Sequence, residues 1–280
     1  MGEYAGQVAV ITGAGSGLGA AMADAFAGAG ARIALLDIDG ERAEAKAAEL
    51  RGRGTEAFAM RVDVADKASV QAAADAVGAR FGACHVLCAN VGVQQFGAID
   101  RLTDHDWDWV MSVNFRGVVD TVGAFLPLIR ASAGRRHIVL TASASYFQLG
   151  ARMAAYVASK FAVVGYGEVL RQELAAEGVN VAMLFPAGMM TRHIESSIAA
   201  RPAELGPSRF DQEDIRVMAA SSDVDTAADV ATAPEAVRNL LAELATGEPY
   251  IVTHGSYRHQ VEARQKRVID AFRRMEEARQ

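Results

Sequence analysis

The feature that most constrains the fold is an alternation of short apolar runs with longer helical segments. The apolar runs are rich in Val, Ile and Leu without polar alternation, which is typical of parallel strands covered on both faces. We expect seven strands, at residues 8–12, 32–37, 56–62, 86–89, 137–142, 179–185 and 250–253. Helical spacing occurs at about 67–81, 104–131, 155–177 and 227–245. This order predicts an α/β fold with a doubly wound parallel sheet and helices on both faces.

Two regions fall outside the alternation. Residues 189–225 form a long insertion between a strand and a helix, and such insertions are usually functional. We expect residues 1–255 to be a single domain, with residues 256–280 as a C-terminal helical extension. The extension is predicted to be an amphipathic helix packed on its own body or on a sister subunit, because apolar side chains recur at helical spacing at Val261, Val268, Phe272 and Met275.

Composition excludes several classes of protein. The 280 residues carry 28 basic and 34 acidic side chains, a net charge of −6, which disfavours a nucleic-acid partner. No apolar run reaches the roughly 18 residues of a membrane span, and residues 1–7 lack a signal pattern. Cys84 and Cys88 are too few for a disulfide framework and are interpreted as apolar filling beside a strand. We therefore expect a cytoplasmic protein with no membrane, nucleic-acid or metal partner.

A glycine-rich turn follows the first strand. It fits G-x-G-x-x-G/A with Gly15, Gly17 and Ala20, or T-G-x-x-x-G-x-G through Gly13, Gly17 and Gly19. Such a turn brings backbone N–H groups and the positive end of a helix to a diphosphate. The sequence therefore predicts a dinucleotide site, with a simple structural turn as the alternative.

Acidic residues end the next two strands. Asp37 lies 18 residues beyond Gly19, the spacing of an acid that binds the adenosine ribose hydroxyls. Its charge would repel a 2′-phosphate, so the cofactor is expected to be NAD in preference to NADP. Asp63 ends the third strand, where it could bind the adenine amino group. Simple capping is the alternative for both acids.

Tyr156 and Lys160 lie four residues apart, on one face of a predicted helix. An ammonium beside a phenol lowers its pKa from about 10 toward neutral pH, as a general acid/base for an alcohol proton requires. Ser143 ends the fifth strand, at the sheet edge where ligands bind. Asn114 is unfavourable within a helix and is a further candidate site residue.

Together these motifs resemble the short-chain dehydrogenase/reductase family, in its single-domain branch with a Rossmann-like fold. The resemblance implies that Tyr156 exchanges the substrate proton, Ser143 binds the substrate oxygen, Lys160 holds the nicotinamide ribose and Asn114 orders a water. Hydride would pass between the substrate carbon and the nicotinamide. The resemblance also implies a cofactor site formed by Gly13, Ser16, Gly17, Leu18, Gly19, Asp37, Asp63, Val64, Asn90, Gly92, Tyr156, Lys160, Pro186, Gly188, Met189 and Thr191.

The sequence departs from the family pattern at three places. Ala89 replaces an asparagine whose amide often braces the sheet, and Ala187 precedes Gly188 after the sixth strand. A charged tail follows Thr253-His254-Gly255, which puts the family's usual tetramer contact in doubt. We expect a homodimer or a homotetramer.

The expected substrate pocket is rich in apolar and thioether groups, which suits a hydrophobic alcohol or ketone. The alternative is that several of its side chains only cover the cofactor. The residues predicted to contact substrate are Gln95, Ser145, Phe147, Met153, Met190 and His193. The leading hypothesis is an NAD-dependent oxidoreductase that interconverts a hydrophobic secondary alcohol and its ketone. An NADPH-dependent ketoreductase of the 3-oxoacyl type and a non-catalytic nucleotide-binding scaffold are the alternatives.

Overall fold

The computed structural model describes residues 2–191, 193–208, 210–221 and 230–279. Seven strands form one parallel sheet in the order β3-β2-β1-β4-β5-β6-β9. The strand order reverses between β1 and β4, and ligands bind open α/β sheets at such a switch point. This arrangement confirms the predicted doubly wound fold. The strands are β1 (Val8–Thr12), β2 (Arg32–Asp37), β3 (Ala57–Arg61), β4 (Val86–Ala89), β5 (Arg136–Thr141), β6 (Val179–Phe185) and β9 (Tyr250–Val252).

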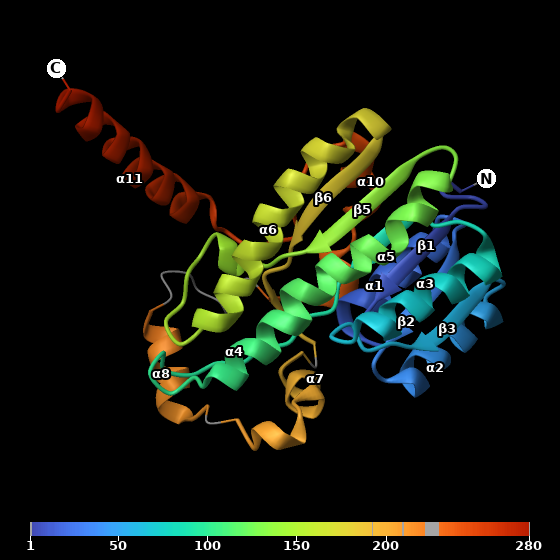
Figure 1. Cartoon of the computed structure of the whole chain (residues 1–280), viewed down its shortest axis with the longest axis horizontal. Helices are drawn as coiled ribbons and strands as arrows, with labels where there is room; N and C mark the ends of the chain where they lie inside the picture. Colours follow the sequence, from blue (N-terminus) through green and yellow to red (C-terminus); the bar gives the residue numbers. More distant parts are fainter. Residues whose placement is uncertain (1, 192, 209, 222–229, 280) are drawn as a thin grey trace.

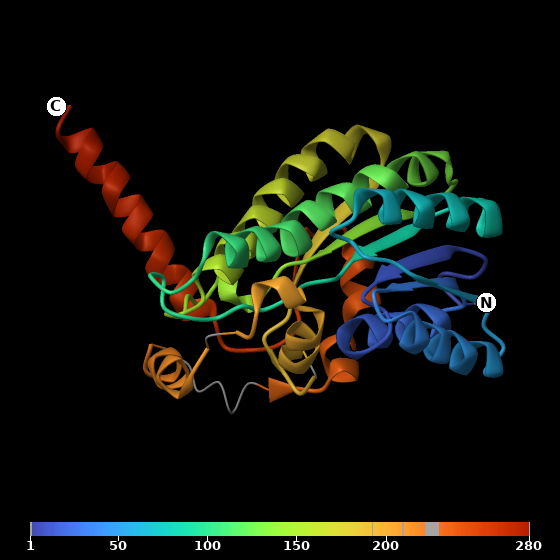
Figure 2. The same ribbon diagram turned by 60° about the horizontal axis from the view of Figure 1, so that its bottom comes forward.

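Helices cover both faces of the sheet (Figure 2). Successive strand residues point to opposite faces, so Val10 joins one core cluster and Ile11 the other. This is why the strands are apolar throughout. The first cluster is covered by α3 (Lys67–Phe81), α5 (Gly117–Ala131) and α6 (Ala154–Leu174), and the second by α1 (Gly17–Gly28), α2 (Gly40–Gly52), α9 (Ala233–Ala236) and α10 (Leu240–Thr246).

Two predicted helices are interrupted. The expected helix over 104–131 consists of α4 (Asp104–Met111), a π-helical turn η1 (Ser112–Arg116) and α5. The helix expected over 227–245 is replaced in its described part by a short strand, α9 and α10, and residues 227–229 lie outside the described residues. Its interruption follows from Pro234, which fits the first turn of α9 but not a helix interior.

The insertion contains short elements beside the carboxyl ends of the strands. They are β7 (Gly188–Met189), α7 (His193–Ala200), a 3₁₀ turn η4 (Ala203–Leu205) and α8 (Gln212–Ala220). The strand β7 pairs with β8 (Val230–Ala231), which the sequence did not predict. Residues 222–225 of the expected insertion lie outside the described residues.

The predicted C-terminal helix is present as α11 (Arg258–Glu277), but it projects away from the body of the molecule (Figure 1). Contact with its own chain occurs near its start, where Arg264 lies over the ring of Tyr146 at 4.9 Å. None of the described residues of α11 is buried, and Phe272 is 59% exposed. Packing along its own body, one of the two expected arrangements, is therefore wrong. Among the described helices, none is long and apolar enough to cross a membrane.

Candidate active site

A cleft of about 1580 Å³ runs along the carboxyl ends of the strands and under the insertion. It brings together the glycine-rich turn, the acidic strand ends and the catalytic candidates, which are far apart in the sequence. The predicted residues that line it are Gly13, Ser16, Gly17, Leu18, Gly19, Asp37, Asp63, Val64, Asn90, Gly92, Ser143, Ser145, Met153, Tyr156, Lys160, Pro186, Gly188, Met189, Thr191 and His193.

The glycine-rich turn leaves the first turn of α1 open to the cleft. Gly13 and Gly17 have φ angles of 67° and 53°, which favour glycine. A Cβ atom on Gly19 would lie 2.1 Å from the carbonyl oxygen of Gly13, so only glycine permits this close approach. Ser16 is the N-cap of α1, but its side chain makes no capping hydrogen bond. The turn therefore fits a diphosphate, with N–H groups and the helix dipole directed at it.

The two acids at the predicted adenosine end of the cleft are held by backbone amides. Asp37 accepts hydrogen bonds from Gly15 N–H at 2.8 Å and Asp39 N–H at 2.9 Å. Asp63 accepts one from Ala65 N–H at 2.9 Å. Both carboxylates therefore also cap local turns, as the alternative interpretation held, while lining the cleft.

Two cations at this end of the cleft were missed from the sequence. Arg42 and Arg61 line the cleft together with Asp37 and Asp63. Arg42 pairs with Asp39 at 3.0 Å. Neither arginine belongs to a motif, and the sequence has 22 other arginines, so no local signal distinguished them.

Asn90 braces the edge of the sheet, a role that Ala89 cannot fill because it has no side-chain amide. Its Nδ2 donates to the Thr12 carbonyl at 3.1 Å, and its Oδ1 accepts from Thr141 Oγ1 at 3.1 Å. It thereby connects β1 to β5 across the end of β4. Ala89 is instead buried in the apolar core.

Tyr156 and Lys160 both line the cleft from α6, in agreement with the predicted common helix face. Ser143 and Gln94 hydrogen-bond with the Tyr156 side chain. The Lys160 Nζ donates to the Thr141 carbonyl at 2.9 Å and lies 5.7 Å from the centroid of the Tyr156 ring. Both residues are buried, at 6% and 3% exposed.

Burial controls the electrostatics of these groups. It raises the pKa of Tyr156, and the hydrogen bonds with Ser143 and Gln94 oppose that rise. The predicted lowering of the Tyr156 pKa toward neutral pH is wrong for this structure, because burial raises the pKa by more than the two hydrogen bonds lower it. Burial lowers the pKa of Lys160 to about 8 and that of His193 to about 4, the latter with a contribution from the Lys160 charge.

Asn114 lies in the π-helical turn η1 behind the catalytic groups, and its side chain does not line the cleft. Its Oδ1 accepts from Val93 N–H at 2.7 Å, and its Nδ2 donates to the Val93 carbonyl and to Ser159 Oγ at 2.9 and 3.0 Å. Single π-helical turns occur mostly at functional sites. Asn114 thus fixes the strand-end loop to the helix that carries Tyr156.

Three residues predicted to contact substrate lie elsewhere. Gln95 is 4% exposed, and its amide bonds to the Phe96 carbonyl, Ser208 and Arg201 of the insertion. Phe147 packs on Phe185 with ring centroids 4.6 Å apart, and Met190 is 70% exposed outside the cleft. The physical reason is orientation: neighbouring side chains of an extended segment point opposite ways, so Gln94 and Phe96 line the cleft and Gln95 does not.

The substrate end of the cleft is lined by apolar residues that sequence reasoning partly missed. They come from α4, η1, the insertion and the start of the extension. No pattern in the sequence places them beside Tyr156, because their elements meet only in the fold. The missed residues are Trp109, Val113, Phe210, Ile215, Met218, Ala219 and Tyr257.

A dinucleotide-binding turn, a Tyr–Lys–Ser group and a cleft at the switch point define a nicotinamide-dependent oxidoreductase of the Rossmann-like class. Residues 7–202 match the short chain dehydrogenase family. The chain therefore belongs to the short-chain dehydrogenase/reductase family and is an oxidoreductase.

Known proteins resemble it over 65% to 99% of its length. The C alpha-dehydrogenase of Sphingobium sp. (strain NBRC 103272 / SYK-6) is 32% identical over 277 residues, which cover 99% of this chain and 90% of that protein. The crystal structure of a short chain dehydrogenase/reductase from Burkholderia phymatum in complex with NAD has a TM-score of 0.85 and 33% identity, with 96% of each chain covered. A metagenomic short-chain oxidoreductase in complex with NADP has a TM-score of 0.62 and 35% identity, covering 65% of this chain and 83% of that one.

Proposed function

We propose that this protein is an NAD-dependent oxidoreductase that interconverts a hydrophobic secondary alcohol and its ketone. The observation that carries the proposal is the buried Tyr156 hydroxyl, hydrogen-bonded with Ser143 and Gln94 and facing the same cleft as the glycine-rich turn. Bound nicotinamide supplies the hydride acceptor or donor.

The residues of the chain would handle the proton and the substrate oxygen. Ser143 lies where it can donate to that oxygen, while Tyr156 takes or gives the alcohol proton. Lys160, fixed by the Thr141 carbonyl, stabilises the negative charge that forms on Tyr156 when it loses its proton. With its pKa lowered to about 8, Lys160 is charged at neutral pH.

Asp37 supports NAD as the cofactor. Its two carboxylate oxygens are held at the adenosine end of the cleft by Gly15 and Asp39 N–H groups. A fixed negative charge there favours ribose hydroxyls and opposes a 2′-phosphate. Arg42 and Arg61 act in the other direction, but Arg42 is paired with Asp39.

The apolar wall supports a hydrophobic substrate. Phe96, Trp109, Met153 and Met218 line the cleft beyond the catalytic groups. His193 is neutral at pH 7 because burial lowers its pKa to about 4. A neutral, apolar pocket stabilises a substrate of the same character through burial of apolar surface.

The test is NADH formation from NAD with aromatic, terpenoid, steroid and cyclic secondary alcohols, with NADP in parallel. We expect turnover with NAD, a lower kcat/KM with NADP, and a loss of about 100-fold or more in Tyr156→Phe with NAD affinity unchanged. Tyr166→Phe is the matched control, since Tyr166 lies on the same helix and packs on Phe115, away from the cleft. Unchanged turnover in Tyr156→Phe would refute the mechanism, and a preference for NADP would refute the cofactor assignment.

A further inference from the structure

The helix α8 carries part of the cleft wall and is fastened at both ends to one turn of the catalytic body. Ile215 and Met218 line the cleft from α8. Just beyond the helix, Ser221 Oγ accepts a hydrogen bond from Ala151 N–H at 3.0 Å. Near its start, Asp214 pairs with Arg152. The two fastening points are therefore adjacent residues, immediately before the helix α6 that carries the catalytic tyrosine.

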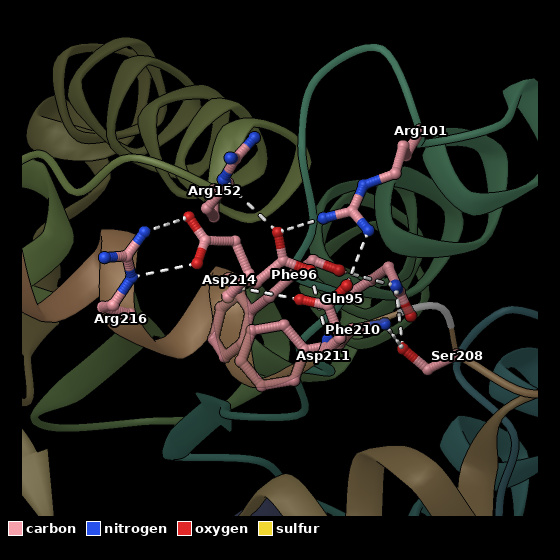
Figure 3. A network of polar contacts seen from close by, with 10 residues as sticks. Gln95, Phe96, Arg101, Arg152, Ser208, Phe210, Asp211, Asp214 and Arg216 are labelled. Atoms are coloured by element: carbon pink, nitrogen blue, oxygen red, sulfur yellow. Dashed lines mark hydrogen bonds and ion pairs between the residues drawn. The ribbon is translucent and has the colours of Figure 1, made fainter.

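Asp214 is a buried carboxylate surrounded by two guanidinium groups (Figure 3). Its side chain is 0% exposed, and its Oδ1 lies 2.5 Å from Arg101 Nη2 and 3.3 Å from Arg152 Nε. It also accepts from the Asp211 N–H at 3.1 Å, in the capping box of α8. A buried charge is costly unless it is paired, so Asp214 holds the helix where both cations can reach it.

Arg152 is held in an unfavourable conformation at this contact. Its φ angle of 66° is the only positive value among the described residues other than glycine. Its carbonyl accepts from Gly97 N–H at 2.9 Å, which ties the turn to the strand-end loop that includes Phe96. Such backbone strain persists when the surrounding contacts require it. The turn before α6 is thus fixed on one side by Gly97 and on the other by Asp214.

We propose that Asp214 is a positioning residue for the substrate, which sets the distance between the α8 wall and Tyr156. It touches neither substrate nor cofactor, and acts through Arg101 and Arg152. Small displacements of a substrate-positioning wall are enough to lose a productive geometry. Only the kinetic test of this proposal rests on the proposed alcohol oxidation. Hydrogen exchange tests the attachment of α8 to the turn before α6 without any substrate.

The test compares Asp214→Asn with Glu213→Gln in the full-length protein. Asparagine keeps the size and one acceptor oxygen of Asp214 but removes its charge. Glu213 directly precedes Asp214 in the same helix, is 50% exposed, and pairs with Arg216 within the helix. We expect amide hydrogen exchange over residues 211–221 to quicken by about tenfold in Asp214→Asn and to stay within about twofold in Glu213→Gln.

The kinetic arm uses 2-butanol and 1-(2-naphthyl)ethanol with saturating NAD. In Asp214→Asn we expect KM for the naphthyl alcohol to rise about tenfold, with kcat for 2-butanol and NAD affinity unchanged. Equal changes in the kinetics of both alcohols, or faster hydrogen exchange with an unchanged KM for the naphthyl alcohol, would overturn the role of Asp214 in substrate positioning. Unchanged exchange would overturn the fastening. If the wild-type protein oxidises no alcohol, the proposed function fails while exchange still decides on the fastening. Arg101→Gln, at a residue 37% exposed, serves if Asp214→Asn does not fold.

Discussion

Arg201 joins the insertion to the body of the protein through a buried ion pair. Its Nη2 lies 2.7 Å from Asp106 Oδ1, and the two side chains are only 8% and 6% exposed. The same guanidinium donates to Gln95 Oε1 at 2.9 Å and to the Gly206 and Leu205 carbonyls at 2.7 and 3.2 Å. All these acceptors lose their partner when the guanidinium is removed.

Arg201→Met keeps most of the aliphatic stem and leaves the Asp106 carboxylate buried without its cation. Breaking a buried pair in this way costs about 3–5 kcal/mol, out of a total stability of about 5–15 kcal/mol for typical domains. We expect this loss in guanidinium unfolding, as a lower transition midpoint. The matched control is Arg216→Met, also on the insertion, whose side chain is 77% exposed and pairs with Glu213 in the same helix. Its midpoint should match the wild type.

The pH dependence of the stability lost in Arg201→Met gives a second check. Burial raises the pKa of Asp106, but hydrogen bonds from Thr103 and Arg201 outweigh burial and hold it below its ordinary value. The carboxylate therefore contributes stability that is complete above its unfolded pKa of about 3.9 and is lost as the pH falls through the lower folded value. The difference between wild type and Arg201→Met should narrow below about pH 4. A loss no larger than that of Arg216→Met, or a gap that widens in acid, would refute this account.

Two further predictions concern the cleft. Gly19→Ala places a Cβ atom 2.1 Å from the Gly13 carbonyl oxygen, so α1 must shift and NAD affinity should fall about tenfold or more in a titration, whereas Gly28→Ala, with open space around it, should bind NAD normally. Lys160→Met removes an ammonium whose pKa is lowered by burial to about 8. Because the unfolded chain binds more protons than the folded one between about pH 8 and 10.4, the variant should be more stable than the wild type by about 1–3 kcal/mol at pH 7 in thermal unfolding, and this gain should shrink toward pH 10. The variant should also lose turnover. Equal destabilisation of Lys160→Met at pH 7 and pH 10 would contradict this reasoning.

The parts of the fold that the sequence predicts are those determined by local pattern. Each strand of the sheet supplies both cores, as Val10 and Ile11 do, so its apolar character is continuous and visible in the chain. The glycine turn and the Tyr156–Lys160 pair are likewise local spacings that fix geometry by themselves. Their positions along the cleft followed from the parallel topology.

The substrate wall depends on contacts between distant segments and was only partly predictable. Gln95 was predicted to contact substrate, but its partners Arg201 and Ser208 lie 106 and 113 residues away and turn its amide from the cleft. Asp214 is an acid in a polar helix of the insertion, and nothing beside it in the chain indicates that it is completely buried. The projection of α11 could not be predicted either, since its apolar spacing is the same whether or not a surface covers it.

The segment 93–96 connects the catalytic group to the insertion. Val93 is bonded to Asn114 through its N–H and carbonyl, and Gln94 bonds to Tyr156 through its side chain and to Ser197 of the insertion through its N–H, at 2.9 Å. Gln95 is held by the insertion as described above. Since these contacts come from consecutive residues, a displacement of α7, which carries Ser197, changes the environment of the Tyr156 hydroxyl as well as the pocket wall. The cleft-facing side chains of α8, by contrast, form part of the pocket wall. Substitutions there can alter substrate selection without altering proton transfer.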